Sequence, residues 1–139
     1  MKITLNTSKV TIYTDGASRG NPGPSAIGVI IKDETGKTIA TISKRLGSTT
    51  NNQAEYRAIV AGLEKAISLG ARQVTLKSDS ELVVKQLNGL YKIKNAALRP
   101  LYQEVVRLTG SLESFSISYI PRSQNAAADA LANRALDGF

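Results

Sequence analysis

The sequence contains no cysteine, no histidine and no tryptophan. Without cysteine and histidine, the chain has no disulfide, no thiolate nucleophile, no cysteine–histidine zinc site and no serine–histidine–aspartate triad. A metal site would need oxygen ligands, which favours Mg²⁺, Mn²⁺ or Ca²⁺. No apolar run reaches the ~18 residues of a membrane span, and the N-terminus lacks the apolar segment of a signal peptide. We therefore expect no membrane association and a cytoplasmic location.

The 139 residues carry 18 lysines and arginines against 11 acidic residues, a net charge of +7. A positive field of this size favours a polyanionic partner such as nucleic acid, although it also suits solubility alone. The length predicts one domain over residues 1–139. No interface stripe is evident, so we expect a monomer.

The hydrophobic pattern predicts a mixed α/β fold. The predicted strands are residues 10–15, 26–32, 37–44, 73–77 and 115–120, and the predicted helices are residues 52–69, 81–87, 98–108 and 125–136. The glycine- and proline-rich residues 16–24 are predicted to form a loop. Short connections make the first three strands an antiparallel meander, and the helices between later strands imply parallel pairing. The result is a mixed five-stranded sheet flanked by helices.

Four carboxylates occupy unusual positions. Asp15 ends an apolar strand and Asp79 directly follows another, while Glu55 and Asp129 lie among apolar helical residues. Carboxylates near buried surface are costly unless they are paired, hydrogen-bonded or bound to metal. In open α/β sheets, ligands collect outside the carboxyl ends of the strands, where Asp15 and Asp79 are expected. This combination suggests a shared cation.

Each carboxylate also has an ordinary explanation. Asp15 suits a turn, Glu55 suits the first turn of a helix, Asp79 suits a helix cap, and Asp129 suits an exposed helix face. These explanations stay open at this point, because no single position decides between them.

Four segments in order resemble the motifs of type 1 ribonucleases H. These segments are residues 13–24 (YTDGASRGNPGP), 50–56 (TNNQAEY), 78–80 (SDS) and 121–133 (PRSQNAAADALAN). The resemblance extends from about Lys9 to Leu136 and implies the ribonuclease H fold as a single domain. Four motifs in the family's order make the resemblance specific.

The resemblance implies a metal site formed by Asp15, Glu55, Asp79 and Asp129. It also implies two Mg²⁺ ions, with Mn²⁺ able to substitute, and hydrolysis of the RNA strand of RNA–DNA hybrids by an endonuclease. The expected products carry 5′-phosphate and 3′-hydroxyl ends. Two alternatives are a catalytically weak module that binds nucleic acid, and an activity on double-stranded RNA.

Substrate-binding residues follow from the same motifs. Asn21, Asn51 and Asn52 match family positions that read the minor groove and the RNA 2′-hydroxyl, which amides suit because they both donate and accept hydrogen bonds. Thr50 and Asn95 match a pocket for a phosphate of the DNA strand. Asparagine and threonine also form turns and caps, so a purely structural role is the alternative for each.

The sequence departs from the family pattern in two ways. Many members carry a mobile histidine shortly before the last aspartate, whereas this chain has Arg122 in the corresponding loop and resembles the subgroup without that histidine. Arginine cannot act as a base at neutral pH, but it could stabilise phosphate charge, help product release or make a general phosphate contact. The tryptophan-containing basic protrusion of some members is also missing. We therefore expect weaker and more salt-sensitive binding of the hybrid.

Overall fold

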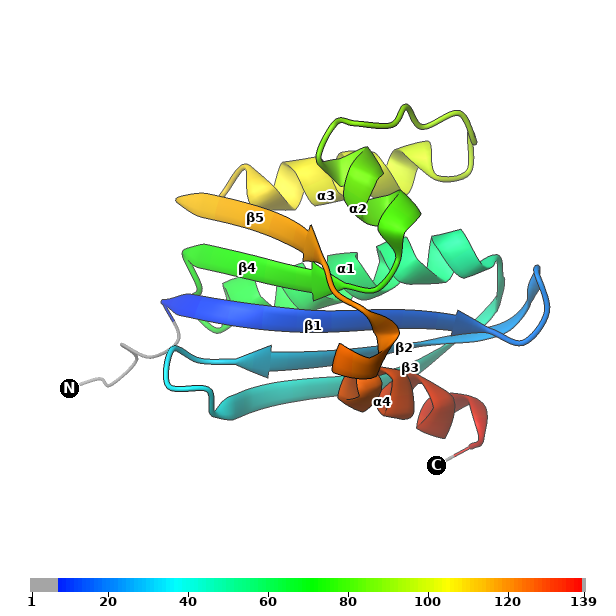
Figure 1. Ribbon diagram of the computed structural model, residues 1–139, viewed down its shortest axis with the longest axis horizontal. Coiled ribbons are helices and arrows are strands. Elements are labelled where there is room, and N and C mark those ends of the chain that lie inside the picture. Colours follow the sequence, from blue (N-terminus) through cyan, green and yellow to red (C-terminus); the bar gives the residue numbers. More distant parts are fainter. Residues whose placement is uncertain (1–7, 139) are drawn as a thin grey trace.

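The strand β1 (Lys9–Ser18) lies at the centre of a five-stranded sheet, in a computed structural model that describes residues 8–138 (Figure 1). On one side β1 pairs antiparallel with β2 (Gly23–Lys32), which pairs antiparallel with β3 (Thr38–Thr49). On the other side β1 pairs parallel with β4 (Gln73–Ser78), which pairs parallel with β5 (Ser114–Tyr119). The order β3-β2-β1-β4-β5 confirms the predicted mixed sheet.

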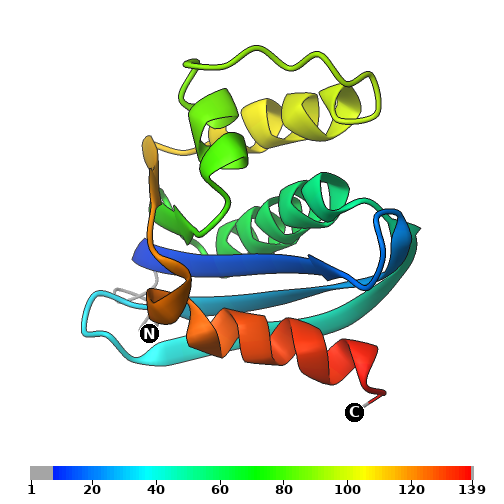
Figure 2. The same ribbon diagram turned by 45° about the vertical axis from the view of Figure 1, so that its right-hand side comes forward.

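Helices cover both faces of this sheet. The helix α1 (Asn51–Ser68) packs on β1 and β2, with α3 (Arg99–Thr109) beside it, and α2 (Glu81–Leu87) follows β4. The opposite face carries α4 (Ala126–Leu136), which a short 3₁₀ helix, η2 (Arg122–Gln124), precedes (Figure 2). Because both faces are covered, β2 is buried along almost its whole length, whereas the edge strand β3 is largely exposed.

The predicted loop over residues 16–24 is wrong at both ends. The strand β1 continues to Ser18 and β2 already begins at Gly23, so only residues 19–22 connect them. Gly16, Ala17 and Ser18 pair in register with the β2 backbone. Glycine-rich sequence usually indicates a loop. Here the small residues remain paired in the sheet, because helices pack so closely on this part of it that larger side chains would not fit. The strand β3 also extends beyond its predicted end at residue 44, to Thr49.

Two glycines allow the helices to touch the sheet backbone. A Cβ atom on Gly28 of β2 would lie 2.0 Å from the carbonyl oxygen of Ala128 and 2.7 Å from the amide nitrogen of Ala132, both in α4. A Cβ atom on Gly16 of β1 would lie 2.2 Å from the carbonyl carbon of Ala54 in α1. Neither backbone can yield at these distances, so both sites require glycine.

We predict that Gly28→Ala will destabilise the protein by about 3 kcal/mol, because the added methyl group pushes α4 off the sheet. Urea denaturation of both proteins measures this loss. The matched control is Gly110→Ala, since a Cβ atom at Gly110 meets its nearest neighbours at an ordinary 3.4 Å. Equal stabilities for the two variants would contradict the close approach of α4.

Candidate active site

Two of the four carboxylates lie side by side where the parallel ladder between β1 and β4 ends. Thr14 of β1 pairs with Ser78, the last residue of β4, so Asp15 and Asp79 directly follow the last pair of this ladder, although β1 itself continues to Ser18. Asp15 is only 5% exposed, because α4 covers this face of β1. The expected juxtaposition of these two residues is therefore present, but the prediction that Asp15 ends its strand is wrong, because β1 stays paired with β2 as far as Ser18.

Glu55 reaches the same place from α1. The helix begins at Asn51, after a capping box formed by Thr50 and Gln53, which makes Glu55 its fifth residue. Glu55 therefore lies beyond the first turn, and the helix-dipole explanation of its position weakens. Its buried side chain accepts a hydrogen bond at Oε1 from the amide of Gly16 (3.1 Å). This contact depends on the close approach of α1 at Gly16.

Asp129 comes from the opposite face of the sheet. It lies in the first turn of α4, and its side chain is 30% exposed. Its neighbour Ala128 lies over Gly28, and Gly28 is the cross-strand partner of Asp15. The missing side chain at Gly28 therefore lets α4 bring Asp129 towards Asp15. The alternative explanation, in which Asp129 lies on an exposed helix face, therefore does not fit its position.

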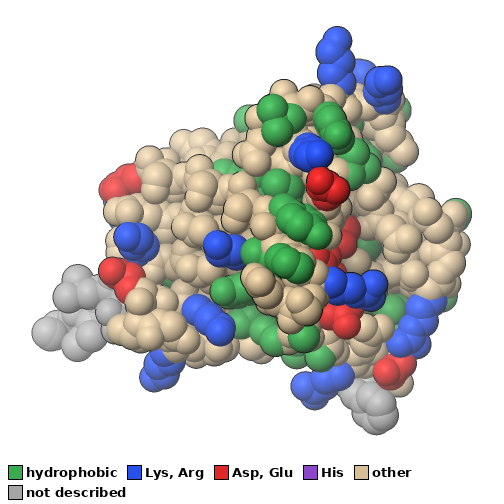
Figure 3. All heavy atoms as spheres, viewed as in Figure 1, with side chains coloured by type: hydrophobic (Ala, Val, Ile, Leu, Met, Phe, Trp, Pro, Cys, Tyr) green, Lys and Arg blue, Asp and Glu red, His purple; other side chains and the backbone are tan. Residues whose placement is uncertain are grey.

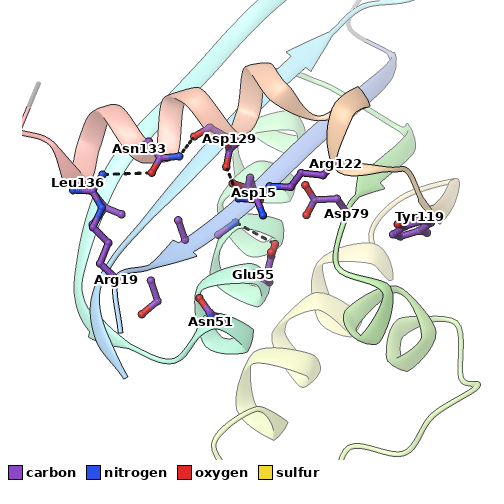
Figure 4. A pocket seen from close by; sticks show the side chains of 13 residues that line it. Asp15, Arg19, Asn51, Glu55, Asp79, Tyr119, Arg122, Asp129, Asn133 and Leu136 are labelled. Atoms are coloured by element: carbon purple, nitrogen blue, oxygen red, sulfur yellow. Dashed lines mark hydrogen bonds and ion pairs between the residues drawn. The ribbon is translucent and has the colours of Figure 1, made fainter. Parts of the chain in front are cut away.

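A cavity of about 400 Å³ collects these side chains (Figure 4). Among the described residues, Asp15, Glu55 and Asp79 each offer an oxygen atom within 4.8 Å of the others. Asp129 lies outside this group of three but lines the same cavity. Arg122 stands at the rim, with Nη2 3.7 Å from Oδ1 of Asp129.

Burial and mutual repulsion favour the protonated forms of Asp15 and Glu55. Burial, followed by the charges of Asp79 and Asp129, raises the pKa of Asp15 from 3.8 to about 8. Burial, followed by the charges of Asp15 and Asp79, also raises the pKa of Glu55 well above its ordinary value. The positive charge of Arg122 acts in the opposite direction on both groups. A divalent cation would relieve the repulsion that the protons now relieve.

Acidic and basic side chains are unevenly distributed on the molecular surface. In Figure 3, acidic side chains lie between α4 and the end of the sheet near α2 with a basic side chain beside them, and further basic side chains are scattered over the rest of this face. The protein is thus positive as a whole and negative at the cavity. A positive surface attracts a polyanion, while a local acidic cluster attracts cations.

The three predicted groove-reading asparagines occupy different surroundings. Asn51 lines the cavity. Asn21 lies outside the cavity lining, but its Oδ1 accepts a hydrogen bond from the Asn51 amide (3.0 Å), which joins the β1–β2 turn to the start of α1. Asn52 is partly exposed at the next position of α1. The turn and the helix start are thus brought together beside the carboxylates.

The two residues expected at a phosphate pocket both make local hydrogen bonds. Thr50 caps α1, and Asn95 accepts a hydrogen bond from the amide of Ala97 (2.8 Å). A second cavity of about 450 Å³ opens nearby and includes Ser48, Gln53 and Arg57, but not Thr50 or Asn95. The structural alternative for these two residues therefore gains support.

Other residues line the main cavity without having been singled out from the sequence, among them Arg19, Tyr119 and Asn133. Asn133 follows Asp129 by one helical turn and donates to its carbonyl oxygen (3.0 Å), so helical spacing from Asp129 could have identified it. Arg19 is paired with Asp137 at the end of α4 (2.6 Å). Arg19 lies within the first family motif but was not assigned a role there, and no sequence pattern indicated Tyr119.

The fold and this carboxylate-lined cavity define a ribonuclease H-like domain, and a family model described as reverse transcriptase-like matches residues 13–135. Ribonuclease HI of Halobacterium salinarum is 43% identical over 129 residues, which cover 93% of this chain and 65% of the relative. The crystal structure of ribonuclease H1 from the same organism superposes with a TM-score of 0.92 and covers 94% of this chain and 99% of that one. The chain belongs to the type 1 ribonuclease H family.

Two other relatives are informative: one was solved with bound nucleic acid, and one is much longer than this chain. LC11-RNase H1, whose structure was solved in complex with an RNA/DNA hybrid, is 41% identical, with a TM-score of 0.88 over 93% of this chain and 97% of that one. A bifunctional protein of Mycobacterium tuberculosis is 42% identical over 93% of this chain, which spans only 36% of that protein. The chain thus corresponds to about a third of the mycobacterial relative.

We predict that the metal-free protein loses stability as the pH rises from about 4 to about 8. In this range the folded state keeps the proton of Asp15, whose pKa is raised to about 8, whereas the unfolded chain has released it. Asp15→Asn should therefore flatten the pH dependence and raise Tm at pH 8 by at least about 3 °C.

Thermal unfolding in a chelator at pH 5 and pH 8 tests this expectation. Glu34→Gln is the control, because it removes an exposed carboxylate on the β2–β3 turn. If Asp15→Asn keeps the wild-type pH dependence, the proton on the cluster does not govern stability.

Proposed function

We propose that this chain is an endoribonuclease that hydrolyses the RNA strand of RNA–DNA hybrids and leaves 5′-phosphate and 3′-hydroxyl ends. The observation that carries the proposal is the convergence of Asp15, Glu55 and Asp79 within 4.8 Å, in a cavity that Asp129 also lines. Family membership supports the reaction class, and the hybrid bound to LC11-RNase H1 supports the substrate class.

The cluster fits divalent metal ions by its donor set and its charge. All four side chains offer hard oxygen ligands, and burial, followed by the charges of neighbouring carboxylates, raises the pKa of Asp15 and of Glu55. A bound cation would favour the ionised forms of both groups. We assign Asp15, Glu55, Asp79 and Asp129 as ligands of two Mg²⁺ ions, with Mn²⁺ able to substitute. Such ions supply Lewis-acid stabilisation of the charge that develops on the phosphate during an in-line displacement.

The protein's own side chains would bind and orient the hybrid. Asn21, Asn51 and Asn52 lie where the β1–β2 turn meets α1, and their amides can exchange hydrogen bonds with the 2′-hydroxyl groups of an RNA strand. Thr50 and Asn95 are assigned to a phosphate of the DNA strand, and the local hydrogen bonds of both would have to rearrange or be shared. Arg122 can place its guanidinium against the phosphate beside Asp129.

The monomeric state stays a prediction of the sequence. No helix between residues 8 and 138 is both long and apolar enough to cross a membrane. The cytoplasmic location stays a prediction of the sequence.

We predict that the wild-type protein cuts the RNA of a labelled hybrid in Mg²⁺ or Mn²⁺. Asp15→Asn and Asp79→Asn should each lower kcat by at least about a hundredfold, because each removes a charged ligand of the site. Single-stranded RNA, double-stranded RNA and DNA duplexes of the same sequence are the substrate controls, and Glu34→Gln is the protein control. Hybrid binding without cleavage would indicate a binding module, and cleavage of the RNA duplex would indicate the double-stranded RNA activity.

We predict that Arg122→Ala lowers kcat about tenfold, equivalent to about 1.4 kcal/mol, with a smaller effect on KM. The Arg122 side chain is 83% exposed and its guanidinium lies close to Asp129, so it can reach a phosphate at the cavity. Steady-state kinetics on the hybrid measure both constants. The matched control is Arg134→Ala, which removes an exposed arginine of α4 outside the cavity lining. A rise in KM alone, with kcat intact, would reduce Arg122 to a general phosphate contact.

A further inference from the structure

Asn125 precedes α4 but does not behave as a helix cap. Asparagine is favoured at this position because its side-chain oxygen can accept a hydrogen bond from the amides of the first turn. Here the side chain makes no capping hydrogen bond, although Asn125 is the N-cap residue of α4. It is instead turned into the protein, where the residue is only 1% exposed. The position therefore gives up an ordinary stabilising interaction.

The side-chain amide of Asn125 is directed at the carboxylate cluster. Its Nδ2 donates to the carbonyl oxygen of Thr14 (2.8 Å), the residue directly before Asp15, and to Oδ2 of Asp79 (3.3 Å). Its backbone carbonyl oxygen accepts the first hydrogen bond of α4, from the backbone amide of Asp129 (3.1 Å). One residue thus links β1, the end of β4 and the first turn of α4, which carry three of the four carboxylates.

The remaining polar atom of this side chain is not satisfied. Among residues 8–138, Oδ1 of Asn125 is buried without a hydrogen-bond partner, and so is Oγ1 of Thr14. A buried unpaired acceptor costs folding free energy, as does the forfeited cap. Stability alone would not select this arrangement, which points to a role in the site.

We propose that Asn125 is a positioning residue that fixes the carboxylate of Asp79 relative to Asp15 and Asp129, and so sets the geometry of the metal site. This inference rests on the proposed function. An amide suits the role because it donates to Asp79 without bringing a positive charge. A lysine or arginine there would also orient the carboxylate, but it would cancel the negative charge that attracts a cation. The hydrogen bond engages Oδ2 of Asp79 and restricts the rotation of the carboxylate.

Metal affinity without nucleic acid is the direct test. Asn125→Ala and Asn125→Ser should each weaken Mn²⁺ binding, measured by calorimetry, by about tenfold or more, as is typical when a residue that orients a metal ligand is lost. Serine can cap α4, so Asn125→Ser should be more stable than Asn125→Ala while losing as much affinity. This separation of stability from affinity would not follow from a merely structural role.

Asn88→Ala is the matched control. The Asn88 side chain also donates to a strand carbonyl, that of Ile117 (3.3 Å), but it lies outside the cavity lining. The Asn88→Ala substitution should lower Tm without changing Mn²⁺ affinity. If both Asn125 variants bind Mn²⁺ within twofold of wild type, the inference is overturned.

The wild-type protein provides a measurement that does not depend on how the variants fold. In a titration with Mg²⁺, the side-chain amide resonances of Asn125 should shift with the midpoint of metal binding, whereas those of Asn88 should not. Resonances of Asn125 that stay unchanged at saturation would contradict the inference. Weakened Mn²⁺ binding in the variants together with a wild-type protein that cuts no hybrid would support the inference and overturn the proposed function.

Discussion

The direct contact of two helices with the backbone of β1 and β2 is the constraint on which the site depends. Gly16 lets α1 approach β1, and its amide then binds Glu55. Gly28, the cross-strand partner of Asp15, lets α4 approach the other face at Ala128. Any side chain at these two positions would separate the layers. Carboxylates from opposite faces of the sheet could then no longer meet at one cavity.

Bringing the carboxylates together creates an electrostatic cost that the fold does not remove. Burial and repulsion raise the pKa of Asp15 and of Glu55, and the exposed guanidinium of Arg122 offsets this only in part. A site assembled for stability would have paired these groups with buried cations. Protons reduce the repulsion in the cluster, and a divalent ion would replace them, so the raised pKa values and the proposed activity have the same physical cause.

The sequence was sufficient to predict much of this arrangement. Alternating and helical hydrophobic patterns predicted the strands and α-helices of residues 8–138 in the observed order, but not the 3₁₀ helix η2. Asp15 and Asp79 were expected together because each was predicted at the carboxyl end of a strand. The pattern failed at residues 16–24, where small residues that normally form loops continue the ladder to Ser18. Local propensity depends on neighbours along the chain, so it carries no information about the two helices that pack on this part of the sheet and require small side chains there.

The sequence by itself determined which residue types were available: four carboxylates near apolar surface, no histidine or cysteine to compete with them, and an excess of positive charge. Only the tertiary structure decided how they are held. Asn125 looked like an ordinary helix start, yet its amide reaches Thr14 and Asp79, which lie 111 and 46 residues away along the chain. Arg19 and Tyr119 likewise join the cavity only through folding. Periodicity and spacing describe neighbours along the chain, whereas hydrogen bonds and charge repulsion depend on distances that the packing of helices on the sheet sets.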